Sequence, residues 1–441
     1  MPAQAQSLLD LYQAARSFDA PYQSAQAQLQ ASQARVGQAR AALLPQISLQ
    51  AGAQRSATDL SISGVPIPGV PDTSSSRYNT LNAGLNGTQP LYRPVNGIGW
   101  DQSRKQFEQA QAQLIAAEQD LIVRLSQAYF DVLAAADSLL TVRAQKKEVE
   151  QQLQSAQRNF KLGNATITDS REAQSRFDLV VAQEIGAEND LHVKQLALDQ
   201  LTGRPNSRPH PLAQPITLPS PQPDNVDAWV SRAVARHPSV LQNRMALDIA
   251  SMEIAKAKAG HLPTLDLQAN LGQQRYPDGN GSVATPGMPA MAQNTAYHTN
   301  TASIGLVFNW SLFTGLSVVN RVREAQALQD KARSDLANTE RTVSQAARAA
   351  FFGVQSGLSQ VRAYEAAEQS SLTSLQANQL GYKVGARINI DVLNAQSQLY
   401  QTRRDLAKAR YDVLTGLLRL QQAAGTLKAA DLEPINRLLE N

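Results

Sequence analysis

The fold is decided by residues 381–397, GYKVGARINIDVLNAQS, which lie between two long segments with helical periodicity. Lys383 falls in the last turn of the first segment, and Gly385 can adopt the left-handed conformation that follows a helix end. Asn389 offers a capping acceptor, and Asp391 places a negative charge at the start of the next helix. The stretch is therefore predicted to be the tight bend of a helical hairpin.

The same bend occurs 222 residues earlier, in residues 160–175, FKLGNATITDSREAQS. Gly163 matches Gly385, and Asp169 matches Asp391. The tripeptide Ala-Gln-Ser follows both acidic residues at the same distance. The sequence thus predicts an internal duplication with one hairpin turn in each half.

The composition favours long helices in close contact, because aromatic residues make up only 5% of the chain and Ala and Gln recur throughout. The net charge is +4, but Lys and Arg are interspersed with acidic residues. We interpret them as solvated helix faces rather than as a nucleic-acid site. The absence of cysteine excludes disulfides, thiol catalysis, Cys-ligated metals and a lipid-modified N-terminal Cys.

The sequence contains no run of about 18 apolar residues, so no transmembrane helix is predicted. Residues 1–6 lead directly into a helical pattern, and no secretion signal is visible. If the protein is exported, we expect this sequence to be a mature form with a replaced start.

The first half is predicted to span residues 1–203, because apolar residues follow helical spacing in some segments and strict alternation in others. The expected elements are a helix over about 7–43, strands over about 46–60 and 78–92, a long helix over about 101–160 and a helix over about 169–201.

The second half is predicted to span residues 225–425 with the same plan. The expected elements are a helix over about 227–258, strands over about 263–276 and 297–313, a long helix over about 318–382 and a helix over about 391–425. Residues 204–224 hold seven of the 21 prolines and are predicted to be an extended connector. Residues 426–441 are expected to form a C-terminal tail. We place the connector and the tail in an equatorial region.

The long helix over 101–160 has an apolar seam with a mean spacing of 3.5 residues, which predicts left-handed supercoiling. Lys146 is the one polar residue in this seam. We therefore expect the long helices to form coiled-coil pairs.

The strands carry Ala and Leu on one face and Asn, Gln, Ser and Gly on the other, which suits an outer-membrane barrel with a wet lumen. A soluble sandwich is the alternative. Aromatic residues near the strand ends favour the membrane interpretation; they are Tyr78, Tyr92, Tyr276, Tyr297, Trp310 and Phe313.

Four strands cannot close a barrel, and open edges are not tolerated in lipid. Two copies would give eight strands with a filled interior, whereas three copies give twelve strands and leave a pore. We therefore predict a homotrimer. Its fold class is mainly α with membrane β: a twelve-stranded barrel, four strands per chain, is continued by a long α-helical barrel.

The chain resembles the TolC family of outer-membrane channels over nearly its whole length. The resemblance rests on the duplicated plan, on both bends and on the Leu-Pro strand entries at Leu44-Pro45 and Leu262-Pro263. It implies a trimeric exit duct in the outer membrane of a Gram-negative bacterium, with its helices in the periplasm. The implied partners are a periplasmic adaptor and an inner-membrane pump or ABC exporter, in drug efflux or type I protein secretion. No cofactor and no nucleic acid are implied.

The resemblance also implies a gate at the periplasmic end. Tyr382 and Arg387 would hold Asp169 in the closed state, with Thr168 assisting. Asp391 would form a ring of three carboxylates that attracts a pore-blocking divalent cation.

The family that the chain resembles often has a second acidic ring one turn further on, but this sequence has Asn394 at that position. The turn residues Gly163, Asn164, Gly385 and Ala386 would contact the adaptor. From the residues alone, both aspartates can equally be helix-start residues that complement the helix dipole, and both glycines can be simple helix caps.

The sequence also bears on two other classes of protein. An enzyme is not expected, because the five histidines are dispersed and none is paired at metal-ligand spacing. A soluble periplasmic coiled-coil scaffold or adaptor agrees with the helices. It does not explain alternating strands at the same place in both halves.

Overall fold

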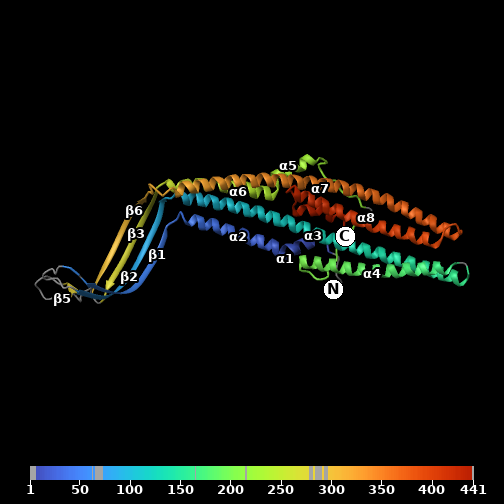
Figure 1. Ribbon diagram of the computed structural model, residues 1–441, viewed down its shortest axis with the longest axis horizontal. Coiled ribbons are helices and arrows are strands. Elements are labelled where there is room, and N and C mark those ends of the chain that lie inside the picture. The colour runs from blue at the N-terminus through green and yellow to red at the C-terminus, as the bar shows by residue number, and fades with distance from the viewer. Residues whose placement is uncertain are drawn as a thin grey trace. The chain divides into compact units, whose positions relative to one another are not determined.

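The computed structural model describes residues 6–61, 63–64, 73–163, 165–213, 216–277, 282–283, 291–292 and 296–439. Long helices account for most of these residues (Figure 1). The longest are α3 (Pro94–Lys161), α4 (Ile167–Thr202), α7 (Ser317–Lys383) and α8 (Asn389–Ala423). The shorter helices are α1 (Leu8–Phe18), α2 (Ala20–Ala41), α5 (Val226–Arg236), α6 (Pro238–Lys258) and α9 (Leu432–Asn436), with 3-10 turns η1 (Ala259–His261) and η2 (Ala429–Asp431).

Four long strands form one antiparallel sheet in the order β1-β2-β3-β6. They are β1 (Gln46–Ser61), β2 (Thr73–Tyr92), β3 (Thr264–Tyr276) and β6 (Tyr297–Asn309). The hairpin of the first half thus pairs with that of the second half through β2 and β3. Strands β1 and β6 are the edges of this sheet within the described chain.

The strand bounds differ from the predicted ones in three places. Strand β2 begins at Thr73 rather than near 78, because Ser- and Thr-rich residues without apolar alternation continue the pairing with β1. Strand β6 ends at Asn309, so Trp310 and Phe313 follow the strand. Between β3 and β6, a short ribbon that was not predicted is present, in which β4 (Ser282–Val283) pairs with β5 (Met291–Ala292).

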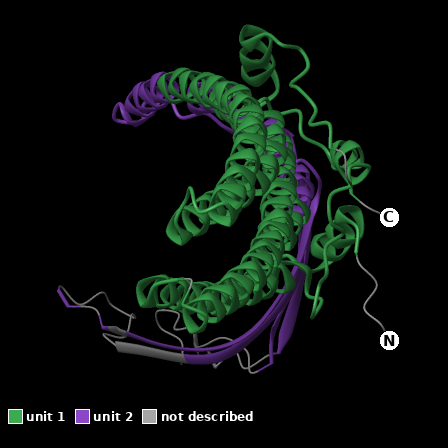
Figure 2. Cartoon of the chain, turned by 90° about the vertical axis from the view of Figure 1, so that its right-hand side faces the viewer, with its two compact units in different colours: residues 1–31, 108–247, 332–441 green, residues 32–107, 248–331 purple. Residues whose placement is uncertain are grey.

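The chain divides into two compact units (Figure 2). The first consists of residues 1–31, 108–247 and 332–441, and the second of residues 32–107 and 248–331. Each unit takes residues from both halves of the sequence, because the repeated segments of the two halves pack against each other.

The core of the first unit is built mainly on α3, which packs against α1, α4 and α8. Its largest fully buried side chains include Tyr129 and Phe130. Lys146, the polar residue in the predicted apolar seam, pairs with Glu184 of α4 at 2.6 Å. An ion pair at the edge of the α3–α4 contact thus occupies that position.

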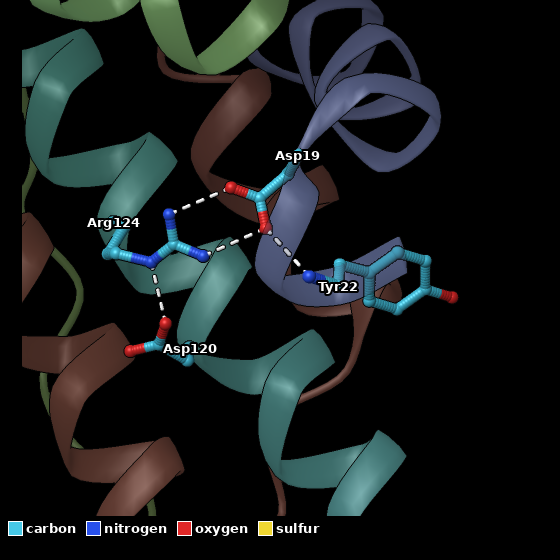
Figure 3. A network of polar contacts seen from close by, with 4 residues as sticks. All are labelled: Asp19, Tyr22, Asp120 and Arg124. Carbon is cyan, nitrogen blue, oxygen red and sulfur yellow. Dashed lines mark hydrogen bonds and ion pairs between the residues drawn. The ribbon is translucent and has the colours of Figure 1, made fainter. Parts of the chain in front are cut away.

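The helix predicted over 7–43 is divided in two, because Asp19 leaves helical geometry with a ψ of 115°. Its buried carboxylate accepts the N–H of Tyr22 at 3.0 Å and so caps α2. Arg124 of α3 donates to both carboxylate oxygens, at 2.9 and 3.0 Å, and its Nε donates to Asp120 (Figure 3). The break is thus held by a charge on a distant helix.

The helix predicted over 227–258 is also divided, at His237, which lies 218 residues after Asp19. Pro238 follows it, and a proline has no N–H for the preceding turn. The Nδ1 of His237 accepts the N–H of Ser239 at 3.2 Å. Burial lowers the pKa of His237, which favours this neutral acceptor form. The break is therefore repeated in the two halves, with an imidazole replacing the carboxylate.

Each of the two helix breaks lies against a glycine: the glycine at the end of α4 for the first break and the glycine after α8 for the second. Gly203 and Gly425 both have a φ of 67° and lie 222 residues apart. A Cβ on Gly203 would lie 2.7 Å from the ring of Phe18, and one on Gly425 would lie 2.4 Å from the Cα of His237. Only glycine satisfies both the backbone conformation and the close approach.

The C-terminal segment does not trail away as a tail, contrary to the sequence prediction. Leu427, Leu432, Ile435 and Leu439 are buried in the core of the first unit. Apolar residues at this spacing lose solvent contact when they pack against α1 and α3. The described part of the connector 204–224 has no helix and only isolated bridges, including Leu212 with Leu439.

In the second unit, the sheet leaves apolar side chains exposed; they include Ile47, Leu49, Leu85, Leu271, Ile304, Leu306 and Phe308. On the other side, Asp266 of β3 is buried and accepts two hydrogen bonds from Arg93, at 2.8 and 2.6 Å. These two hydrogen bonds join the residue that follows β2 to β3. None of the helices in the described residues has the length and apolarity needed to cross a membrane.

Candidate functional site at the two helical turns

The first turn joins α3 to α4 through Gly163, whose φ is 77°. Its N–H donates to the carbonyl of Phe160 at 3.0 Å and ends α3. Helix α4 then begins with a capping box. The Thr166 hydroxyl accepts the N–H of Asp169 at 3.2 Å, and the Asp169 carboxylate accepts the N–H of Thr166 at 3.0 Å.

The second turn joins α7 to α8 through Gly385, whose φ is 76°. The N–H groups of Ala386 and Arg387 both donate to the carbonyl of Gly381, at 2.8 and 3.1 Å. A Cβ on Gly381 would lie 2.7 Å from the Arg387 side chain, so this glycine lets the chain fold back closely. The predicted bend is therefore built on two glycines.

Asn389 does not cap α8, contrary to the sequence prediction. The N-cap position belongs to Ile388, which makes no side-chain cap. Asn389 is fully buried instead: its Oδ1 accepts from Gln152 of α3, and its Nδ2 donates to the carbonyl of Asp169 at 3.4 Å. This amide therefore joins the start of α8 to the other hairpin.

Further polar contacts join the two hairpins along α8. Gln396 donates to Glu148 at 2.6 Å, and Arg404 donates to Gln145 at 3.2 Å. An apolar cluster also joins the two hairpins, because its members come from α3, α4 and α8. The buried members are Leu153, Ala156, Ala173 and Leu393. The sequence analysis missed this line of contacts. Its visible signal was a set of Gln and Asn residues at helical spacing on α3 and α8.

The residues of the predicted latch have local partners in the single chain. The ring of Tyr382 packs against a cluster formed by Leu375, Val392 and Leu399. Arg387 lies 3.7 Å from Asp391, one turn further on. Asp169 is engaged in the capping box and Thr168 is exposed. In the described chain, no hydrogen bond or ion pair joins Asp169 to Tyr382 or Arg387.

The two positions of the predicted constriction ring differ in their surroundings. Asp391 lies in the first turn of α8 and is partly exposed. Asn394, one turn later, is exposed and accepts a hydrogen bond from Arg176 of α4 at 2.7 Å. A neutral amide therefore occupies the position of the second ring and is paired with a cation on the other hairpin.

Among the predicted contact residues at the turns, Gly163, Gly385 and Ala386 are exposed, whereas Asn164 lies outside the described residues. Exposed apolar residues flank them; they are Leu162, Ile167, Val384 and Ile388. The turns thus present apolar surface on both hairpins, which the sequence analysis did not single out. No cluster of three or more potential metal ligands occurs among the described side chains.

A polar groove of about 680 Å³ lies between α3, α4 and α8. Tyr411, one of the lining residues, donates to the half-buried carboxylate of Asp137 at 2.6 Å. Burial raises the pKa of Asp137, although the hydrogen bond from Tyr411 and the charge of Arg410 act against the shift. Lys194 of α4 pairs with Asp131 of α3 across the groove at 3.1 Å.

The model of the outer membrane efflux protein family matches residues 11–204 and 229–426. The chain belongs to this family. The predicted resemblance to TolC is confirmed: the chain is 34% identical to the outer membrane protein TolC of Vibrio cholerae over 98% of its own length and 93% of that protein. It is 32% identical to TolC of Escherichia coli, over 99% of this chain and 86% of that protein.

The chain is also similar to proteins that are named for secretion. The alkaline protease secretion protein AprF of Pseudomonas aeruginosa is 32% identical over 97% of this chain and 86% of that protein. Among solved structures, the Campylobacter jejuni CmeC outer membrane channel has a TM-score of 0.78, covering 98% of this chain and 90% of that chain at 16% identity. That likeness shows a shared fold. The family is one of channels rather than of enzymes.

Proposed function

We propose that three copies of this chain form an outer-membrane channel. The observation that carries the proposal is a four-stranded sheet whose apolar face is exposed and whose outer edges, on β1 and β6, have no partner strand among the described residues. An exposed apolar face is not stable in water, and unpaired strand edges are not stable in lipid, so a single copy is stable in neither. Three copies supply the twelve strands of a barrel with a pore.

The two helical hairpins, α3–α4 and α7–α8, form the wall of a periplasmic conduit in this assembly. The repeats at residues 1–203 and 225–425 each supply one hairpin. The connector 204–224 and the C-terminal segment form the equatorial region. Membership of the outer membrane efflux protein family supports a location in the outer membrane of a Gram-negative bacterium.

The channel serves as the exit duct of a tripartite efflux pump or of a type I protein secretion system. Similarity to TolC and to a protein named for alkaline protease secretion supports both roles. The partners are a periplasmic adaptor and an inner-membrane pump or ABC exporter. The exposed apolar residues at the turns, beside Gly163 and Gly385, offer the adaptor a surface on both hairpins.

The gate lies at the turns, and its latch forms between neighbouring copies. Within one chain, Arg387 faces Asp391 and Asp169 caps its own helix. An exposed Arg387 can exchange this weak contact for Asp169 of a neighbour, with Tyr382 and Thr168 beside it. A charge-assisted hydrogen bond contributes about 1.5–3 kcal/mol, so three copies give a closed state that still opens.

Asp391 forms the constriction ring of the closed gate. Three carboxylates near one axis repel one another, and together they attract a divalent cation. Asn394 contributes no second ring, because it is neutral and its oxygen already accepts from Arg176. We therefore place the block by divalent cations at Asp391 alone.

The experiment that tests the proposal is extraction of the protein from outer membranes, followed by native mass measurement in detergent and by recording in planar bilayers. We expect a detergent-dependent trimer that conducts ions. A monomer that remains monodisperse without detergent and forms no pores would refute the proposal and support the soluble scaffold instead.

A further inference from the structure

The register of the four-stranded sheet assigns each paired side chain to one of two faces. Leu49 pairs with Leu85, Leu85 with Leu271 and Leu271 with Ala302, so these four residues form one row on the apolar face. Because successive side chains of a strand alternate between the faces, every second residue from this row lies on the same face. The apolar face can therefore be followed row by row along the strands, away from the helices.

The apolar face becomes basic at its end far from the helices. Arg275 pairs with Leu81, which lies four residues from Leu85 on β2. Arg55 lies one row further out, opposite the residue two positions before Leu81, and Arg77 lies two rows further out. All three arginine side chains are exposed. We refer to Arg55, Arg77 and Arg275 as the basic cluster.

The basic cluster has no acidic partner in the part of the chain that the structure describes. None of its three guanidinium groups forms an ion pair or a side-chain hydrogen bond there. The acidic residue among the paired residues of this face is Asp59, one row beyond Arg77. His298, which pairs with Arg275, is a further basic residue. The cluster thus keeps a positive charge that a ligand can neutralise.

The opposite face is uncharged at the same level. Between the rows of Arg275 and Arg77, its paired residues are Gln54, Ser56, Tyr78, Thr80, Tyr276 and Tyr297. The ring of Tyr276 stacks on that of Tyr297 with 4.6 Å between the centroids, so tyrosines expected at the lipid interface lie on the polar face. A rim surrounded only by water would tolerate charges on both faces. The arginines instead gather on the face whose other rows are apolar.

The position of the basic cluster along the strands matches the edge of a membrane. On β3, the run from Leu265 to Arg275 covers ten residues, or about 34 Å of strand. Its polar side chain on this face, Gln273, donates to Asn300 at 3.0 Å. Barrel strands tilt by about 40°, so the run spans about 26 Å along the membrane normal, against an apolar band about 25 Å tall. Arg275 therefore lies at the boundary of the band, and the other two arginines lie about 5 and 10 Å beyond it.

Arginine side chains at this depth favour a phosphate ligand. A guanidinium group offers phosphate two parallel N–H donors and is weakly hydrated, so it binds phosphate well beside apolar surface. Arginine on the lipid side of a barrel is costly at the membrane midplane and nearly neutral at the interface, where the headgroups lie. Three arginines at three heights suit a headgroup that carries more than one phosphate.

We propose that the basic cluster binds the phosphate groups of a lipid headgroup in the leaflet far from the helices. The exposed apolar rows next to the cluster then contact the acyl chains of the same lipid. The inference rests on the proposed function, because it requires the sheet to lie in the outer membrane with its helices in the periplasm. The ligand is therefore a phosphorylated lipid of the outer leaflet.

The test is a titration of the full-length protein, purified in a neutral detergent, with diphosphoryl lipid A, followed by native mass measurement. The sheet variant carries Arg55→Gln, Arg77→Gln and Arg275→Gln. A second variant carries Arg77→Gln alone. It changes the arginine furthest from the apolar rows, and it decides the question if the sheet variant does not assemble.

The matched control variant carries Arg35→Gln, Arg40→Gln and Arg323→Gln. These arginines are exposed, belong to the same compact unit and lie on helices α2 and α7 rather than on the sheet. The control therefore removes the same charge from the protein without changing the basic cluster. Lipid A from which the phosphates have been removed is the matched control ligand.

We expect diphosphoryl lipid A to bind the sheet variant on the order of 100-fold more weakly than the wild type, because each arginine near the headgroups contributes about fivefold. Arg77→Gln alone should lose about fivefold, and the control variant should bind like the wild type. Dephosphorylated lipid A should bind the wild type as weakly as diphosphoryl lipid A binds the sheet variant. Inorganic phosphate in large excess should not displace the lipid, because it has no acyl chains.

Equal affinity of the sheet and control variants would overturn the inference. Displacement of the lipid by inorganic phosphate would also overturn it, and would mark a site for free anions. If the wild type is a conducting trimer but binds diphosphoryl and dephosphorylated lipid A equally, the lipid site is wrong and the proposed function stands. A protein that stays monodisperse without detergent and forms no pores would refute both.

Discussion

Replacing Arg124 by Leu tests whether a distant charge holds the break between α1 and α2. Arg124 donates two hydrogen bonds to the carboxylate of Asp19 (Figure 3). The side chain of Asp19 is only 4% exposed. Removal of one partner of a buried ion pair costs about 3–5 kcal/mol, because the other charge stays buried. Since about a third of the Arg124 side chain is exposed, we expect the lower end of this range, about 3 kcal/mol.

The assay is amide hydrogen exchange of the peptide that contains Asp19 and Tyr22, because the N–H of Tyr22 donates to the carboxylate. A loss of about 3 kcal/mol corresponds to exchange about 100-fold faster when local opening limits the rate. The matched control is Asp120→Ala, which removes the exposed partner of the same guanidinium and should cost less than about 1 kcal/mol. Equal exchange in the two variants would refute the reasoning.

The pH dependence gives a second readout of the same pair. Burial by itself raises the pKa of Asp19, but the hydrogen bonds from Arg124 and from the Tyr22 N–H outweigh it, and the pKa lies below its ordinary value. The stabilisation is therefore complete above the unfolded-state pKa of about 4 and is lost as the pH falls below it. Arg124→Leu should largely remove this acid sensitivity of exchange.

Three further predictions concern the gate and the hydrogen bond between Tyr411 and Asp137. The double change Tyr382→Phe, Arg387→Ser should raise single-channel conductance in planar bilayers; conductance at the wild-type level would remove the latch assignment. Asp391→Asn should weaken block by divalent cations added on the helical side, and unchanged block would place the cation elsewhere. Burial raises the pKa of Asp137, so its contribution to stability falls as the pH rises above about 4. Asp137→Asn keeps an acceptor for Tyr411 and should flatten the pH profile of thermal unfolding, whereas an unchanged profile would contradict the assignment.

The positions of the strands and the hairpin turns could be predicted because their signals are local. A left-handed glycine such as Gly385 followed by a helix start, or an alternation of Leu and Gln, needs no distant residue to be read. The breaks at Asp19 and His237 could not be predicted in this way. In the sequence, Asp19 looks like an ordinary polar residue on a helix. Its role becomes clear only in the structure, where Arg124, 105 residues later, donates to it.

The site shows the same division. Asn389 is a good capping residue by type, yet it is buried against Gln152 and Asp169 and caps nothing. The C-terminal segment looks like a tail in the sequence, yet Leu432 and Ile435 complete the core. In both cases, burial depends on which parts of the fold pack against the residue. The conformational preference of a single residue type does not contain that information.

By itself, the sequence determined the duplication, the two turns, the alternating strands and the family, because each can be recognised from the spacing or the type of residues along the chain. The tertiary structure decided which faces are covered: Phe130 of α3 is buried, whereas Phe352, which lies 222 residues later on α7, is exposed. The physical reason is that burial is a property of neighbours. Within the described residues, the sheet edges on β1 and β6 and the side chain of Phe352 have no covering neighbour, whereas the corresponding inner strands and Phe130 do.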